Sequence, residues 1–226
     1  MAIINKIKKL PKLQSFVDDS LQGNINTIHL KKIQSETESD LYIAKGANIH
    51  RYYIDDDMFY GLDNSVTKPL VANNKNAGAV IATQNITGTT DKFRIHATVV
   101  ECKKTNFVFL DSVNILYLPN PRTACFVLAC LNSKLLDWLF RKTSTDNHCN
   151  MYELLDLPMP SDGLSCNELY SCVTKLLELH SENHNVKIRL DMILYHLYGL
   201  TYDEVLVVDP ETPITREQYE SGEYQG

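Results

Sequence analysis

The stretch LNSKLLDWLFRKTSTDNHCNMYELLDLPMP, residues 131–160, changes character twice along its length. Its beginning completes an apolar stripe at intervals of four, four and three residues, formed by Val127, Leu131, Leu135 and Trp138. This spacing predicts one buried helix, which Asn120 can cap and Pro121 can start. The middle has no aliphatic side chain, and the end carries two prolines. The stretch therefore predicts a helix that ends near Arg141, a polar loop, and a short strand that proline stops.

Before this helix, from about residue 23 to 118, short apolar runs alternate with turns. The runs are LYIA at 41–44, AGAVIAT at 77–83, DKFRIHATVVE at 91–101 and NFVFLDSVNILYL at 106–118. A turn at 46–48 follows the first run. In the third run, alternate residues predict one apolar face and one polar face, the polar one formed by Arg94, His96 and Thr98. Together these runs predict a mainly antiparallel sheet.

Helical signals return after the prolines. Residues 165–168 and 201–204 each read as a capping box, with a hydroxyl at the first position and a glutamate at the last. A further helix is predicted over about residues 186–198, and Gly199 follows it where a left-handed helix stop is needed. The predicted fold class is therefore α+β, with a mainly antiparallel sheet followed by packed α-helices.

Charge is distributed unevenly along the chain, whose net charge is −6. Residues 1–160 carry 18 Lys+Arg against 16 Asp+Glu, or +2, and the remaining residues carry 4 against 12, or −8. The first two-thirds can therefore meet a polyanion. We divide the chain into a basic N-terminal segment at 1–22, a β-rich unit at 23–160, a helical part at 161–208 and a loosely ordered acidic tail at 209–226.

The cysteines and the N-terminus indicate the compartment. The six cysteines include no CxxC pair, so we expect reduced thiols. The sequence contains no run of about eighteen apolar residues, and its N-terminus lacks the apolar core of a secretory signal. These features predict a cytoplasmic protein that does not partner with a membrane.

Two patterns could hold a metal. Asp91 is followed ten residues later by Glu101-Cys102-Lys103, the order in which many Mg²⁺-dependent nucleases place two carboxylates and a lysine. The alternative interpretation is an ordinary strand end with exposed charges, and the motif is short enough for chance matches. His180 and His184 are one helical turn apart but have no third ligand in view, so a polar histidine pair is expected there rather than a metal site.

Four polar, donor-rich turns join the apolar runs, at 45–53, 83–94, 101–106 and 141–148. Each alone is typical of a solvated loop, but four such turns around one sheet indicate a nucleic-acid surface. Cationic side chains neutralise phosphates, whereas amides and hydroxyls can read base edges. We expect phosphate or guanine contacts from Lys45, Arg51, Lys92, Arg94, Lys103, Lys104 and Lys142. We expect base contacts from Gln84, Asn85, Thr89, Asn147 and His148, and we count His50 of the first turn among the DNA-binding residues.

The order of these pieces resembles a known family. The segments LYIAKGANIHRYYI, AVIATQNITGTTDKFRIHATVVE, FVFLDSVNILYL, TACFVLACLNSKLLDWLFRK, MYELLDLPMP and LDMILYHLYGLTYDE follow one another between about Ser20 and Val208. In this order they resemble the TaqI-like C-terminal specificity domain, the target-recognition domain of type II restriction–modification DNA methyltransferases. The most specific parts are LNSKLLDWLFR, ELLDLPMP and LYGLTYDE.

The resemblance implies a sequence-specific reader of double-stranded DNA, with residues 23–160 as the DNA target-recognition domain. It implies a methyltransferase or nuclease domain as partner, in the same polypeptide or in another subunit. The chain lacks the [Asn/Asp/Ser]-Pro-Pro-aromatic motif and the Gly-rich S-adenosylmethionine loop of these methyltransferases. S-adenosylmethionine and Mg²⁺ are therefore expected only in catalytic domains outside this chain. A third possibility is an interaction domain whose helices between residues 165 and 198 bind a protein.

Overall fold

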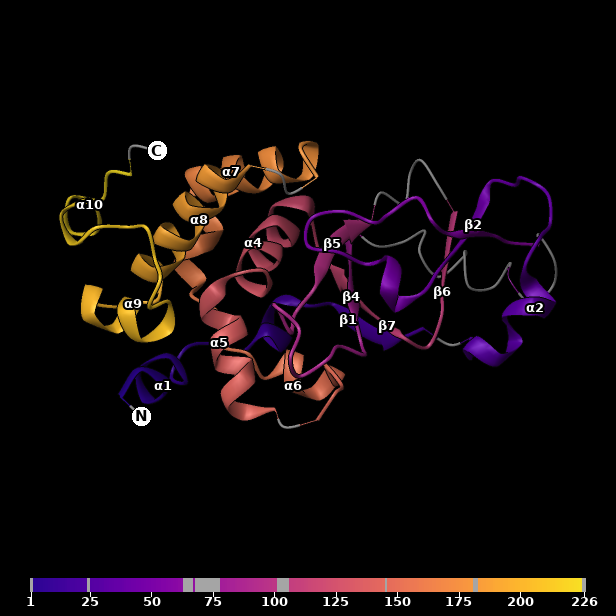
Figure 1. Cartoon of the computed structure of the whole chain (residues 1–226), viewed down its shortest axis with the longest axis horizontal. Coiled ribbons are helices and arrows are strands. Elements are labelled where there is room, and N and C mark those ends of the chain that lie inside the picture. The colour runs from indigo at the N-terminus through magenta and orange to yellow at the C-terminus, as the bar shows by residue number, and fades with distance from the viewer. Residues whose placement is uncertain are drawn as a thin grey trace.

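A computed structural model describes residues 2–23, 25–62, 67, 78–100, 106–144, 146–180 and 183–224. Its β-strands gather at one end of an elongated molecule and the C-terminal helices at the other, with α4 (Pro121–Leu131) and α5 (Lys134–Thr143) between them (Figure 1). The predicted α+β class, a mainly antiparallel sheet with packed helices, is confirmed.

The main sheet has four antiparallel strands in the order β1-β7-β4-β5. They are β1 (Asp19–Gln22), β7 (Val113–Leu118), β4 (Ala79–Gln84) and β5 (Ala97–Val100). A smaller sheet has the order β3-β2-β6, formed by β3 (Phe59–Tyr60), β2 (Leu41–Ala44) and β6 (Asn106–Phe109), and its β2–β6 pair is parallel. The turn at 111–112 therefore carries the chain from the small sheet to the main one.

The main sheet is covered on both faces. Ile81 and Leu116 belong to the core shared with the helices, whereas Val80, Ala82 and Ile115 belong to a second apolar cluster that includes residues of the small sheet. The predicted polar face is consequently wrong in part: Arg94 and Thr98 are buried, and His96 is half-buried. Thr98 lies opposite Ala82, on the face that the second cluster covers, whereas Arg94 precedes β5 and is buried against Thr87 and Phe140.

The helices after the sheet begin with α4, which packs on β4, β5 and β7. The predicted single helix is wrong, because α4 ends at Leu131 and α5 starts at Lys134 with a bend of 61°. Ser133 caps α5 by accepting a hydrogen bond from the Leu136 amide at 3.1 Å. The Asn132 side chain bonds both backbone groups of Ala97, at 3.2 and 2.9 Å. The side chain between the two helices thus connects them to β5.

The other α-helices of the described residues lie along the length of the molecule (Figure 1). They are α1 (Ala2–Ile7), α2 (Leu30–Ile33), α6 (Met151–Leu155), α7 (Asn167–Glu178), α8 (His184–Leu197), α9 (Tyr202–Val208) and α10 (Arg216–Ser221). In the described ranges, none of the helices by itself combines the length and hydropathy needed to cross a membrane. The bent pair α4–α5 meets those two criteria only when its helices are taken together.

Local capping signals are mostly confirmed. Asn120 caps α4 and Pro121 starts it, residues 201–204 form a capping box, and Gly199 has a φ of 67°. The box at 165–168 is wrong: the Cys166 sulfur caps α7 instead, accepting from an amide at 3.4 Å.

The two ends of the chain are both anchored. The predicted strand before Pro160 is reduced to one antiparallel bridge, in which residues 157–159 bond residues 11–13 of the N-terminal segment. The prediction of a loosely ordered C-terminal tail is wrong, because Tyr219 of α10 and Ile214 of the preceding loop are buried. The Tyr219 hydroxyl donates to the Leu200 carbonyl at 2.7 Å.

Candidate nucleic-acid interface

Two of the predicted donor-rich turns form one surface. We call residues 84–94 and 146–149 the paired loops. The Thr87 amide donates to the Asn147 carbonyl at 2.9 Å, and the Cys149 amide donates to the Asn85 carbonyl at 2.6 Å. An isolated antiparallel bridge joins Ile86 to His148 between these bonds. Segments about sixty residues apart are thereby fixed side by side as a short two-stranded ribbon.

The buried side chain of Arg94 forms hydrogen bonds with both of the paired loops. Its side chain is 2% exposed, with Nε donating to the Thr87 hydroxyl at 3.1 Å and Nη2 to the Asp146 carbonyl at 2.7 Å. The guanidinium carbon lies 5.4 Å from the centre of the Phe140 ring. The predicted DNA contact from Arg94 is therefore wrong, because a buried guanidinium cannot reach a phosphate or a base. Its role in this structure is to position both loops.

An ion pair on α5 fixes the other side of the first loop. Asp137 accepts the Arg94 amide at 2.5 Å and the Arg141 Nε at 2.7 Å. Arg141 in turn donates to the carbonyls of Thr89 and Asp91, at 3.2 and 2.6 Å. Neither Asp137 nor Arg141 was predicted to position the loop, although their spacing of four on a predicted helix is a signal for an ion pair.

The carboxylate of Asp91 closes its own turn by accepting the Gly88 amide at 2.7 Å. A hydrogen bond of this kind is typical of a turn-forming aspartate. The other members of the alternative nuclease site, Glu101 and Lys103, lie outside the described residues, as do Lys104 and Cys102.

Five of the predicted DNA-binding residues are exposed on or beside the paired loops: Thr89, Lys92, Lys142, Asn147 and His148. Asn85, in contrast, is buried, and its amide nitrogen lies 3.4 Å from the Asp111 carbonyl, so the predicted base contact from Asn85 is wrong. Gln84 is half-buried and donates to the Ile49 carbonyl at 2.7 Å, which connects the paired loops to the first turn.

The first turn, residues 45–53, meets the paired loops at Phe93. The Arg51 guanidinium lies 3.8 Å from the centre of the Phe93 ring, and its Nε and Nη2 are buried. Burial lowers the pKa of Arg51. The predicted phosphate contact from Arg51 is contradicted, because the buried Nε and Nη2 groups cannot reach a phosphate. Lys45 lies 5.2 Å from the Phe59 ring and is half-buried.

His50 belongs to a stack of three rings. It pairs with Asp55 at 2.9 Å and stacks on Tyr53 with ring centres 4.7 Å apart. Tyr53 stacks in turn on His180 at 5.8 Å. His180 has a φ of 45° and follows the end of α7, whereas His184 begins α8. The predicted spacing of one helical turn is therefore wrong, because His180 and His184 belong to the ends of two different helices.

The acidic side chains of the paired loops are engaged by backbone donors. Asp146 accepts the His148 amide at 2.6 Å, and Asp91 accepts the Gly88 amide. Such bonds partly offset the two negative charges. Lys92 and Lys142 are both exposed, and the Lys92 ammonium lies 5.7 Å from the centre of the Phe93 ring.

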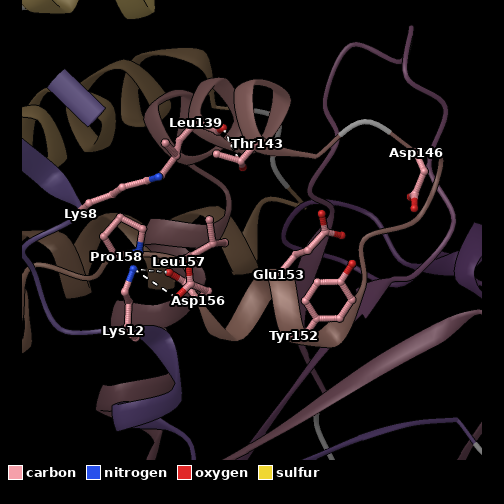
Figure 2. Close-up of a pocket in the computed structure, with 10 residues that line it drawn as sticks. All are labelled: Lys8, Lys12, Leu139, Thr143, Asp146, Tyr152, Glu153, Asp156, Leu157 and Pro158. Atoms are coloured by element: carbon pink, nitrogen blue, oxygen red, sulfur yellow. Dashed lines mark hydrogen bonds and ion pairs between the residues drawn. The ribbon is translucent and has the colours of Figure 1, made fainter. Parts of the chain in front are cut away.

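A groove of about 490 Å³ adjoins the paired loop at residues 146–149 (Figure 2). Lys8 and Lys12 line one side, and Asp146, Tyr152 and Glu153 line the other. Lys12 forms an ion pair with Asp156 at 3.3 Å. The groove thus continues the polar surface of the paired loops toward the N-terminal segment.

Among the residues described above, no group of three or more His, Cys, Asp or Glu side chains could hold a metal ion. Burial raises the pKa of the Cys149 thiol, which lies under the paired loops, to about 11. At neutral pH this thiol is protonated and a poor nucleophile.

A half-buried acidic group lies where α5 and α8 meet. Asp191 of α8 accepts the Lys134 amide at 3.1 Å, while the Lys134 ammonium pairs with Asp209 at 2.6 Å. Burial raises the pKa of Asp191 to about 6, and the nearby Lys134 and Arg51 oppose that rise. The joint between the sheet-bearing part and the C-terminal helices therefore contains a titratable carboxyl group.

Comparison of the sequence with protein-family models and with curated proteins finds no match.

Proposed function

We propose that this chain binds double-stranded DNA and reads its sequence, without catalysis of its own, as a specificity domain of a type II restriction–modification enzyme. The observation that supports this most is the two-stranded ribbon formed by the paired loops. It brings residues 85–87 beside residues 147–149, where Asn147 and His148 are exposed, and Thr89 and Lys92 are exposed further along the first of the two loops. The major groove of B-DNA is wide enough to admit a two-stranded ribbon.

The division of roles follows from exposure and chemistry. Lys92 and Lys142 neutralise phosphates on either side of the ribbon. Asn147, His148 and Thr89 present amide, imidazole and hydroxyl groups to base edges, and each good base contact contributes about 1–3 kcal/mol of discrimination. Arg94, Asp137 and Arg141 position the loops. The DNA contact thus depends on exposed groups that a buried network keeps in place.

The proposal includes a partner. A methyltransferase or nuclease domain, in the same polypeptide or in another subunit, acts on the DNA that this chain selects and holds any S-adenosylmethionine or Mg²⁺ that the reaction needs. The cytoplasmic location expected from the sequence is part of the same proposal.

A salt titration of DNA binding tests the proposal. Fluorescence anisotropy of a labelled duplex gives the slope of log affinity against log salt, to which each phosphate contact adds about 0.9. We expect Lys92→Ala and Lys142→Ala each to reduce the slope by about 0.9. Lys175→Ala is the matched control, because Lys175 is an exposed lysine on α7, in the C-terminal helical part. A wild-type affinity that does not change with salt would refute the proposal.

A further inference from the structure

The paired loops display an apolar side chain at the centre of their outer face. Ile86 is 56% exposed, whereas its neighbours Asn85 and Thr87 are 7% and 2% exposed. Successive residues of an extended segment point to opposite sides. The two polar residues therefore turn inward, where they help to hold the loops, and the isoleucine turns outward.

The geometry of the ribbon fixes the partner of Ile86. The two backbone bonds flank the bridge, running from Thr87 to Asn147 and from Cys149 to Asn85. Ile86 and His148 are consequently a non-hydrogen-bonded pair, the arrangement in which facing side chains lie closest. The His148 side chain is 50% exposed. A branched aliphatic group and an imidazole thus stand together on the outer face.

We infer that Ile86 contacts the C5-methyl group of a thymine in the major groove, and that His148 hydrogen-bonds the edge of the neighbouring base. This inference rests on the proposed function. The thymine methyl is the one apolar group that base pairs present in that groove. Isoleucine suits such a contact because its branched side chain is stiff about χ1. The minor groove, about 6 Å wide, is too narrow for a two-stranded ribbon, which argues against insertion there.

Replacement of thymine by deoxyuridine tests the contact, because it removes only the methyl group. Duplexes that the whole chain binds are first selected from a random library, and each thymine of the selected sequence is then replaced in turn. We expect the wild type to lose about fourfold in affinity at one position, the effect of exposing one methyl group to water. Ile86→Ala should bind the thymine and deoxyuridine duplexes equally at that position.

Matched variants separate this contact from a general loss of binding. Ile86→Val keeps a branched side chain and should keep part of the methyl dependence. Ile28→Ala is the control, because Ile28 is 79% exposed in the 3-10 turn Thr27–His29, outside the paired loops. This control should show the wild-type response to deoxyuridine. Thermal melting of each variant checks that the fold is retained.

The outcomes distinguish the inference from the proposed function. If a sequence is selected but no position depends on the methyl group, or if Ile86→Ala retains the dependence, the inference is overturned and the proposed function stands. If the library yields no selected sequence and binding does not change with salt, the proposed function fails and the inference fails with it.

Discussion

Replacement of the buried Arg94 by methionine should lower stability and separate the paired loops. Methionine keeps the apolar stem and fills similar space, so the main loss is the two hydrogen bonds to the Thr87 hydroxyl and the Asp146 carbonyl. Hydrogen bonds from a charged group contribute about 1.5–3 kcal/mol each. Because part of this is recovered when a charge no longer needs to be buried, we expect a net loss of about 3 kcal/mol.

The loss is measurable in two ways. For a chain of this size, 1 kcal/mol corresponds to about 2–4 °C in melting temperature, so Arg94→Met should melt about 6–12 °C lower. Hydrogen exchange should show a local effect as well, with faster exchange at the amides of Thr87 and Cys149, which bond across the paired loops. DNA affinity should fall as the ribbon loses its fixed geometry.

Arg122→Met is a matched control for this change. Arg122 also makes two side-chain hydrogen bonds, to Leu164 and Asn167 at 2.7 and 2.8 Å, and also lies over an aromatic ring, that of Tyr170. It differs in being exposed, so its loss should cost less than about 1 kcal/mol. If Arg94→Met is no more destabilising than this control, the positioning role assigned to Arg94 is wrong.

Three further changes test the joints of the fold. Ser133→Ala removes the cap of α5 and should cost about 1–2 kcal/mol in urea unfolding. Tyr219→Phe should cost about 1 kcal/mol in the same assay if the C-terminal segment is docked as described. The pKa of Asp191 is raised from 3.8 to about 6, so its protonated form stabilises the fold below pH 3.8, and that contribution is lost as pH rises through 6. Asp191→Asn should remove this fall from melting temperatures measured between pH 4 and 7.

Signals that depend on a few neighbouring residues were readable from the sequence. The cap at Asn120, the start at Pro121 and the stop at Gly199 each satisfy backbone groups or a φ value within one turn of the chain. The strands were readable for a similar reason, because short apolar runs bounded by turns have few other stable arrangements.

The break at Asn132–Ser133 was not readable, because the apolar stripe continues across it without a change of spacing. What stabilises the break is the bonding of Asn132 to Ala97, a residue 35 positions earlier. Helical periodicity reports which side of a segment is expected to be buried, but in α4 every residue from Thr123 to Leu131 is buried. It does not report a partner elsewhere in the chain that changes the helix direction.

In the candidate site, too, contacts between distant residues could not be predicted from the sequence. Asn85 and Arg94 were predicted to touch DNA because they are polar residues of the turns, but both are buried and, together with Thr87, they hold the loops. A loop without a core of its own must satisfy its backbone groups, and short polar side chains do this well. Polar composition therefore marks two kinds of residue, those that build a loop and those that the loop displays. Only the pairing of the loops separates these two kinds of residue. It leaves Ile86, which composition would assign to the core, exposed on the outer face of the loops.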